Sequence, residues 1–477
     1  TPLSKLPGPP GWPLIGNALD MNSYGNTLET LVKWRNKYGD VFKVDLFGEE
    51  IVMVSGQYIN EMLVSKGKEF AARPELPLIA GQLPNGSFMV RQNYDERTIF
   101  VRKLAHKALK QFGEGLDKIE KVSMSQITVF MDELQQDFLN KDFDPDDPLA
   151  KCFTQIVNIM VTGTTLQEDS YLLEEHKELD MIDGRILGGH FALLDTFPSL
   201  IHFPFVPGVK EVKRYSELRQ SIQAYWKSTE DTFDPENLRG IYDVYFKAHK
   251  DFQNSDDVQF SYNYNNIKDD VFEIFIGGFV TTHKFLLAFI NIMASNQKLQ
   301  ANIQKQIDDV IGQTNEPSLH HRGQLGFLEA TIYEIFRYGS HTPLAVPHMT
   351  QEATSIGGYD LPKGTQVWPM LWSMHHDERF WDEPWKFKPE RFMTQEGNLA
   401  SADTRKMLMP FGAGARGCVG EVFAKSRIFL FTATLLQRFN ILPPREGQFK
   451  PWDIKSKEYF RCMPLKTGEF KIRVEPR

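Results

Sequence analysis

The hydrophobic positions along this chain mainly follow the spacing of helices. From about residue 57 to 340, apolar residues recur at intervals of three and four, which predicts a largely helical body. A long apolar run without proline extends from Asn266 to about Asn296 and fits one long helix. Inside it, "EIFIGGFVTTHK" (273–284) carries two glycines, each of which costs about 1 kcal/mol relative to alanine in a helix interior. Either another helix packs closely there, or a flat ligand lies against this helix.

Strand patterns occur at both ends of the chain. "DVFKVDLFGEEIVMVSG" (40–56) alternates around Gly48 and predicts a hairpin, whereas "KLPGPPGWPLIGN" (5–17) predicts an extended strap. Short strands are expected at 341–368, a helix at 421–439, and a second hairpin near the C-terminus around 466–468. We therefore predict a mainly α (α+β) fold in a single domain, 1–477, with a strap and β-rich start (1–56), a helical body (57–340) and a mixed region (341–477).

Composition excludes several classes of protein. The formal net charge of the 477 residues is −8, and the lysines and arginines form no block of the kind that binds nucleic acid. Three widely separated cysteines, Cys152, Cys418 and Cys462, make no disulfide framework, which indicates a reducing compartment. No 18 consecutive residues are apolar, so we expect no membrane span within the chain. The chain does not begin with Met, and a leading segment that was removed is compatible with that start.

One loop carries candidate chemistry. "PFGAGARGCVG" (410–420) places Cys418 among glycines, with Arg416 two residues before it and a helix after it. Backbone amides and the positive end of a helix both favour the thiolate, so we expect a lowered thiol pKa. A nucleophile would also need a base and an orienting group, and none is apparent in the sequence. The other use of such a cysteine is as a metal ligand, in particular a thiolate on haem iron whose electron donation is tuned by amides.

The same loop matches the signature F-x-x-G-x-R-x-C-x-G at every fixed position. The chain thereby resembles the cytochrome P-450 superfamily, and the resemblance extends over essentially its whole length. The matching residues are Phe411, Gly414, Arg416, Cys418 and Gly420. The family implies a large helical domain with small sheets around a buried, thiolate-ligated haem b.

Two charged motifs support the resemblance. "EIFR" (334–337) matches the family's E-x-x-R, and Glu334 and Arg337 can pair because they lie three residues apart on a helix. "FKPERF" (387–392) supplies Arg391, which in the family joins that pair in a buried network. Each of these charged motifs alone would indicate a surface ion pair, but their order along the chain and their separation match the family.

The resemblance implies the other haem contacts. Cys418 would be the axial ligand, and Phe411 would lie against the proximal face of the haem. Arg102 in "TIFVRKLAHKAL", His348 in "AVPHMT" and Arg416 match residues that contact the haem propionates, while Thr98 stands where the family usually has tryptophan.

Several segments look most like the microsomal animal branch of the family. They are the strap (5–17), "AVPHMTQEATSIGGYDLPKGT" and "HHDERFWDEPWKFKPERF". That branch is anchored to the cytoplasmic face of the endoplasmic reticulum membrane by a helix that this chain does not contain. "HFPFVPG" (202–208) then resembles the apolar loop that enters the bilayer.

The long helix departs from the family at one position. "GGFVTT" aligns with the central-helix motif A/G-G-x-D/E-T-T, so Gly277 and Gly278 leave room for oxygen and substrate, and Thr281 supplies the alcohol. Val280 occupies the place of the acid, so the resemblance implies a side chain beside the iron, but valine can neither donate nor accept a proton. Glu273, eight residues before Thr281, is a possible substitute, but we favour a structural role for it against a neighbouring loop.

A missing acid suits family members that rearrange fatty-acid hydroperoxides, because they need no external electrons and no proton relay. We therefore predict an epoxyalcohol synthase-like enzyme with a fatty-acid-like substrate. The alternative is a monooxygenase of lipophilic substrates that uses NADPH and a reductase. Its acidic reductase would dock on a basic surface formed by Lys103, Lys107, Lys110, Lys425 and Arg427. An ordinary solvated face with no partner explains these five charges equally well. A third alternative, a haem carrier or sensor, would leave Gly277, Gly278 and Thr281 without a role.

Overall fold

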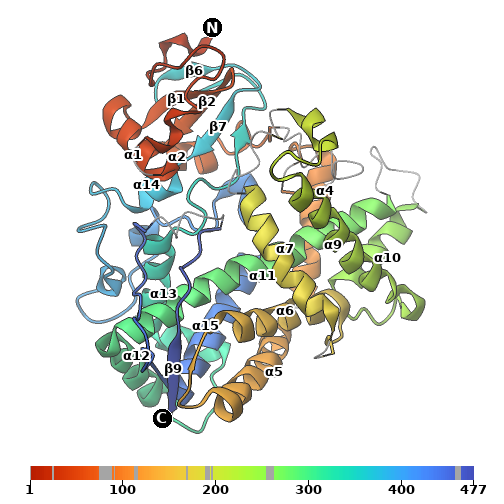
Figure 1. Cartoon of the computed structure of the whole chain (residues 1–477), viewed down its shortest axis with the longest axis vertical. Coiled ribbons are helices and arrows are strands. Elements are labelled where there is room, and N and C mark those ends of the chain that lie inside the picture. The colour runs from red at the N-terminus through yellow and green to blue at the C-terminus, as the bar shows by residue number, and fades with distance from the viewer. Residues whose placement is uncertain are drawn as a thin grey trace.

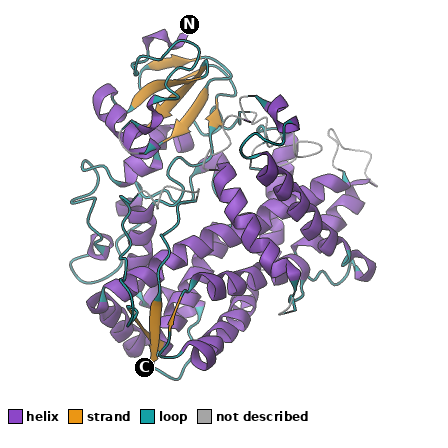
Figure 2. Cartoon of the chain, viewed as in Figure 1, coloured by secondary structure: helices purple, strands orange, loops and turns teal. Residues whose placement is uncertain are grey.

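Helices dominate the structure, which confirms the predicted fold class. The computed structural model describes residues 2–23, 26–74, 89–90, 92–111, 117–167, 170–187, 194, 197–253, 263–456 and 464–477. The long helices form the lower and right-hand parts of the molecule, and most strands gather near the N-terminus (Figures 1 and 2). The helices are α1 (Thr27–Tyr38), α2 (Tyr58–Asn60), α4 (Glu96–Gln111), α5 (Asp117–Glu133), α6 (Asp146–Thr162), α7 (Tyr171–Leu187), α9 (Val209–Lys227), α10 (Ile241–Gln253), α11 (Tyr264–Ser295), α12 (Gln297–Val310), α13 (Gly326–Gly339), α14 (Leu371–His375) and α15 (Glu421–Arg438).

The described residues form three small sheets beside the helices. The largest has the strand order β1-β2-β7-β4, in which β2 and β7 are parallel and the other pairs are antiparallel. Its first two strands form the predicted hairpin, and Gly48 at the turn has a φ of 89°. The strands are β1 (Val41–Leu46), β2 (Glu49–Val54), β3 (Asp142–Phe143), β4 (His348–Met349), β5 (Thr354–Ile356), β6 (Tyr359–Leu361), β7 (Gln366–Pro369), β8 (Phe439–Leu442) and β9 (Ile472–Pro476).

The predicted C-terminal hairpin is wrong for the described residues. β9 pairs with β8 and β3, and residues 464–471 form no strand. The local turn signal around 466–468 was therefore overridden by pairing with a strand about thirty residues earlier in the chain. Cys462 lies outside the described residues.

Helix α11 forms the centre of the fold and is the long helix that the sequence predicts. It begins at Tyr264 with a capping box, in which the Asn263 side chain accepts from the amide of Asn266 and the Asn266 side chain accepts from the amide of Asn263. It has 32 residues, and an 18-residue window within it has a mean hydropathy of 1.4, so by length and composition it could span a membrane, but 67% of that window is buried inside the protein. Figure 1 shows it crossing the molecule between α6, α13 and α15. Its apolar surface thus serves the core.

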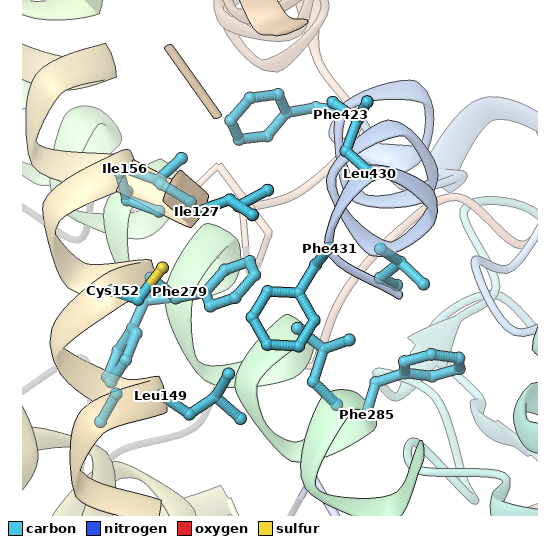
Figure 3. Close-up of a cluster of buried hydrophobic side chains, with 14 of the residues drawn as sticks. Ile127, Leu149, Cys152, Ile156, Phe279, Phe285, Phe423, Leu430 and Phe431 are labelled. Carbon is cyan, nitrogen blue, oxygen red and sulfur yellow. The ribbon is translucent and has the colours of Figure 1, made fainter. Parts of the chain in front are cut away.

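The main core lies where α5, α6, α11 and α15 meet (Figure 3). The ring centroid of Phe431 on α15 lies 5.3 Å from that of Phe130 and 5.5 Å from that of Phe153. Each such aromatic pair adds roughly 0.5–1.5 kcal/mol to the stabilisation from burial. This packing fixes α15, which follows the cysteine loop, against α11, so the core sets the distance between the two chemically distinctive segments.

Candidate active site

One interior cavity brings most of the predicted site residues together. Its volume is about 960 Å³, and it lies between α11 and the loop 410–420. The predicted residues that line it are Arg102, Gly277, Gly278, Thr281, His348, Phe411, Arg416 and Cys418. Because these residues come from segments more than 300 positions apart, their convergence is a property of the whole fold.

The cysteine loop is closed by its own backbone. The amide of Cys418 donates to the carbonyl of Phe411 over 2.9 Å, and the Gly417 amide donates to the Gly414 carbonyl over 3.1 Å. Gly414 has a φ of 66°, and a Cβ atom there would collide with the carbonyl oxygen of Leu63. Only glycine fits this position, so the loop holds one conformation that presents the thiol to the cavity.

The predicted lowering of the thiol pKa is wrong for the thiol on its own. Enclosure within the protein raises the pKa of Cys418, and this effect outweighs the Gly420 amide and the Arg102 charge, which lower it. The sulfur faces the cavity and is accessible from it. A metal ion bound at the sulfur would supply the charge that the loop does not, since coordination deprotonates a thiol.

Two partly buried arginines make one wall of the cavity positive. Arg102 donates to the Gly417 carbonyl over 2.5 Å, and Arg416 donates to the Ala71 carbonyl over 2.7 Å. Burial lowers the pKa of both, to about 10 for Arg416, so both remain charged at neutral pH. Neither has a carboxylate within 4 Å in the part of the chain that the structure describes. A cradle with a thiol and two cations that lack counter-ions fits haem b, whose propionates are carboxylates.

His348 lies beside this positive wall. It is 5% exposed, and its Nδ1 lies 2.7 Å from the carbonyl oxygen of Phe70 and donates to it. Burial, reinforced by the charge of Arg73, holds its pKa well below the ordinary value, so the ring is neutral and its Nε2 is an acceptor. Arg73 also lines the cavity, and it donates to the Pro347 carbonyl over 2.9 Å. No motif in the sequence marks Arg73, which is why it was missed.

Thr98, which stands in place of the family's tryptophan, caps a turn. Its hydroxyl donates to the Asn93 carbonyl over 2.6 Å, and its amide donates to Asp95 Oδ1 over 2.7 Å. The residue is fully buried and does not line the cavity. Arg102, four residues later, is therefore the residue of this helix that supplies a side-chain donor to the cavity.

The predicted charged network is present beneath the cysteine loop. Arg337 and Glu334 are both fully buried and lie 2.8 Å apart, and Arg391 lies 3.1 Å from the same carboxylate. Arg337 also donates to the carbonyls of His375 and Pro384, each over 2.8 Å. This network ties α13 to the segment around 375–391.

The two glycines of α11 have different surroundings. A Cβ atom on Gly277 would have no atom within 4 Å and would project into the cavity, whereas one on Gly278 would contact Val157 of α6 at 3.5 Å. Helix packing therefore accounts for Gly278, whereas Gly277 leaves open space at the cavity, where the ligand remains a prediction. Thr281 donates its hydroxyl to the Gly277 carbonyl over 2.8 Å, which leaves its oxygen lone pairs to accept from a donor in the cavity.

Val280 does not face the cavity. It is 2% exposed and belongs to the main core, about 100° around the helix from Thr281. The expectation that its side chain acts beside the ligand is therefore wrong in position, because packing against neighbouring helices sets the rotation of α11. Glu273 lines the cavity and accepts from the Val90 amide over 3.0 Å, which agrees with the structural role expected for it.

The predicted basic surface loses one member. Lys103, Lys107 and Lys110 are exposed on α4, and Lys425 is half-buried and pairs with Glu421. Arg427 is 1% exposed and cannot belong to any surface. Its side chain points from α15 to α11, because the helix packs this face into the core.

Polar residues that the sequence did not reveal line the cavity at α7 and α9. Tyr215 of α9 donates to Asp183 Oδ1 of α7 over 3.1 Å, and Arg219 of α9 forms an ion pair with Asp269 of α11. These residues come from three helices, and their approach follows from packing that no local pattern encodes.

Comparisons with known proteins agree with the geometry. The profile of the cytochrome P450 family matches residues 6–470. Among curated proteins, a steroid 17-alpha-hydroxylase/17,20 lyase of Ictalurus punctatus is 30% identical, over 97% of this chain and 91% of its own length. Cytochrome P450 2D20 of Mesocricetus auratus is 29% identical over 94% of this chain and 89% of its own, and cytochrome P450 1A2 of Felis catus is 29% identical over 93% and 87%.

The matched region includes the cysteine loop, the charged network beneath it and the glycine step of α11. A thiol, two arginines with no carboxylate within 4 Å among the described residues, and an open helix face therefore occur together within the residues that match the family profile. This chain belongs to the cytochrome P450 family, an enzyme family whose cofactor is a thiolate-ligated haem b.

Proposed function

We propose that this protein is a monooxygenase of lipophilic substrates that takes electrons from NADPH through a reductase. The observation that carries this proposal is the similarity, over 97% of the chain, to a protein described as a hydroxylase and lyase. The sequence led us to favour hydroperoxide rearrangement, and the comparisons support the alternative better. The apolar cavity supports a lipophilic substrate in either case.

Each residue of the cavity has a part in this proposal. Cys418 would hold the haem iron, and Arg102, Arg416 and His348 would bind the propionates. The cofactor supplies the one-electron and oxygen chemistry, and the protein supplies binding, orientation and electrostatics. Gly277 leaves space on the helix side, and Thr281 offers an acceptor to a donor placed there.

Apolar side chains define the remaining wall. Phe272, Ile276 and Leu344 line the cavity, exclude water and orient an apolar substrate by shape. We take the polar group of Asp183 and Tyr215 as the point where a polar substituent of the substrate would be read.

Partners and location follow as further parts of the proposal. Lys103, Lys107 and Lys110 form an exposed row on α4 that suits an acidic reductase. Phe203 and Phe205 are 47% and 81% exposed in the loop before α9, which suits contact with the cytoplasmic face of the endoplasmic reticulum membrane.

Hydroperoxide rearrangement remains a second candidate because of Val280. Where the family motif has an acid, this chain has a core valine, so the usual proton source beside Thr281 is missing. A substrate that brings its own oxygen, as a fatty-acid hydroperoxide does, would need no such source.

The two candidates make opposite demands on oxygen and electrons. Purified holoenzyme with a microsomal reductase, NADPH and ¹⁸O₂ should give a hydroxylated lipid that contains one ¹⁸O atom. The same holoenzyme, incubated anaerobically with a polyunsaturated fatty-acid hydroperoxide and no NADPH, should show negligible conversion. Rapid anaerobic conversion with both hydroperoxide oxygens retained, and no NADPH-dependent product, would replace the first candidate with the second.

A further inference from the structure

Arg427 is a buried cation without a carboxylate partner. It lies on α15 and is 1% exposed, and no carboxylate comes within 4 Å of it among the residues that the structure describes. It lines the same cavity as Cys418 and Thr281. Removing an ion from water is costly, and such groups are normally paired. A cation kept in this position is therefore expected to act on something within the cavity.

The contacts of Arg427 are directed at the glycine step of α11. One nitrogen, Nη2, donates to the Gly278 carbonyl over 2.9 Å and lies 3.2 Å from Thr282 Oγ1. The guanidinium carbon stands 3.8 Å from the ring centroid of Phe423, which is visible between α15 and α6 in Figure 3. The side chain thus bridges α15 and α11 directly behind Gly277 and Thr281.

Two donors of the same group are uncommitted. Within the described residues, Nε and Nη1 of Arg427 have no hydrogen-bond partner. Both atoms are themselves buried, so the guanidinium acts on the cavity through its charge and not through direct contact of these two nitrogens with a ligand. Burial lowers the pKa of Arg427 to about 9, and the group therefore stays charged at neutral pH.

We propose that Arg427 is a positioning residue that holds α11 at Gly278 and Thr282 and gives the Thr281 side of the cavity a positive charge. The family motif would place a negative charge on this helix, at residue 280, but the charge in this chain comes from α15 and has the opposite sign. A positive charge favours negatively charged ligands and strengthens proton donation from neighbouring hydroxyls, because it stabilises the anion that is left when the proton leaves. The hydrogen bond to Gly278 fixes the helix turn that orients the Thr281 hydroxyl.

The charge can be measured through carbon monoxide on the reduced holoenzyme. A nearby positive charge increases electron donation from iron into the antibonding orbital of carbon monoxide, which lowers its C–O stretching frequency. We expect Arg427→Gln to raise that frequency in infrared spectra and Arg427→Lys to leave it close to the native value. Arg438→Gln, at the exposed end of the same helix, is the matched control and should leave it unchanged.

The positioning role can be measured through coupling, the fraction of the NADPH consumed that appears as oxygenated product. A displacement of about 1 Å at a reacting centre can cost on the order of 10²-fold in rate. We therefore expect Arg427→Gln to lower kcat by up to that factor with KM little changed, and to divert NADPH to hydrogen peroxide. Arg427→Lys should impair coupling as well, because an ammonium cannot replace the guanidinium contacts with both Gly278 and Thr282.

The two measurements separate this inference from the proposed function. The coupling measurement rests on the proposed monooxygenase activity, whereas the infrared measurement does not. A raised C–O frequency in Arg427→Gln, without any NADPH-dependent turnover in the native enzyme, would support the charge and reject the monooxygenase. An unchanged frequency in Arg427→Gln overturns the inference, even where thermal stability falls. If Arg427→Gln does not bind haem, the Arg427→Lys variant decides. A C–O frequency equal to that of the native enzyme together with impaired coupling supports the proposal. A native C–O frequency together with native coupling overturns it.

Discussion

Two buried arginines, Arg337 and Arg427, show how differently this fold treats a charge on either side of the cysteine loop. Arg337 is fully buried beneath the loop, and its guanidinium meets the Glu334 carboxylate and several backbone carbonyls. Arg427 is equally buried but meets one carbonyl, one hydroxyl and an aromatic face. The first residue is satisfied within the protein, whereas the second lines the cavity and retains two buried nitrogens without a hydrogen-bond partner among the described residues.

The difference separates a structural charge from a functional one. A network with every donor used can hold α13 and the segment around 375–391 together, but it has nothing left for a ligand. A charge with uncommitted donors costs stability, and its retention points to work at the cavity. Substitutions at the cysteine loop, in the paired network and on α11 can break this contrast.

The largest effect is expected at Cys418, because it is the thiol that faces the cavity. Cys418→Ala should abolish the thiolate-type absorption of the reduced carbon monoxide complex. Cys152→Ala is the control: that thiol is 5% exposed, burial raises its pKa, and it donates to the Gln126 carbonyl, so its loss should leave the spectrum intact. A normal spectrum in Cys418→Ala would contradict the assignment of the ligand.

Breaking the paired charge should come next in size. Glu334→Ala leaves Arg337 and Arg391 without their carboxylate, which typically costs about 3–5 kcal/mol in a buried network. Thermal unfolding and haem content of the purified variant would measure the loss. Glu178→Ala removes the partner of Arg214 at the surface, where such pairs are worth about 0–1 kcal/mol, and serves as the comparison. Equal stability of the two variants would show that the buried network is not structural.

Introducing an acid on α11 tests the other region. Val280→Asp would bury a carboxyl group in the core, where an unpaired polar group costs roughly 1–3 kcal/mol. Burial raises the folded-state pKa of such a carboxyl, so the folded state binds more protons than the unfolded state, and stability should fall as pH rises from 4 to 7. Melting temperatures of the native protein and the variant across this range would show it.

Val422→Asp is the stability control: it makes the same change at a position of α15 that is 62% exposed and should alter stability by no more than about 0.5 kcal/mol.

The Val280→Asp substitution also probes the proposed reaction. A stable Val280→Asp enzyme with faster NADPH-coupled oxygenation would show that the acid can act from the core side of α11, contrary to the packing described above.

The smallest effect concerns an ion pair at the start of α6. Asp146 lies 2.9 Å from His283 of α11 and 2.5 Å from Lys466. Although burial opposes it, bonding to His283 and Lys466 holds the pKa of Asp146 well below its ordinary value. A depressed carboxyl pKa contributes stability above the unfolded value near 4, and this contribution is lost as pH falls.

Asp146→Asn should therefore lower stability at pH 7 by on the order of 1 kcal/mol, since the pair is partly exposed, and by less at pH 3. Asp132→Asn, in the exposed pair with Arg438, should show no such dependence on pH. A constant difference between native protein and Asp146→Asn at both pH values would argue against the ion pair.

Local patterns predicted the elements, and packing decided which way their side chains face. The cysteine loop, Glu334 with Arg337, and the extent of α11 could be predicted because the relevant residues lie within a few positions of one another. Arg427 was assigned to a surface and Val280 to the cavity, and both assignments failed because the rotation of a helix depends on distant partners. The Tyr215–Asp183 pair was missed for the same reason, since it forms only when α7 and α9 meet.

The apolar length of α11 also has a consequence for the synthesis of the chain. Its partner α15 ends at Arg438, about 140 residues after Ser295, and at roughly 5–20 residues per second the ribosome needs on the order of ten seconds to make that stretch. During this interval a helix apolar enough to enter a bilayer lacks the element that covers one of its faces. Until α15 has been made, the nascent chain therefore exposes an apolar face of α11 that the folded protein covers.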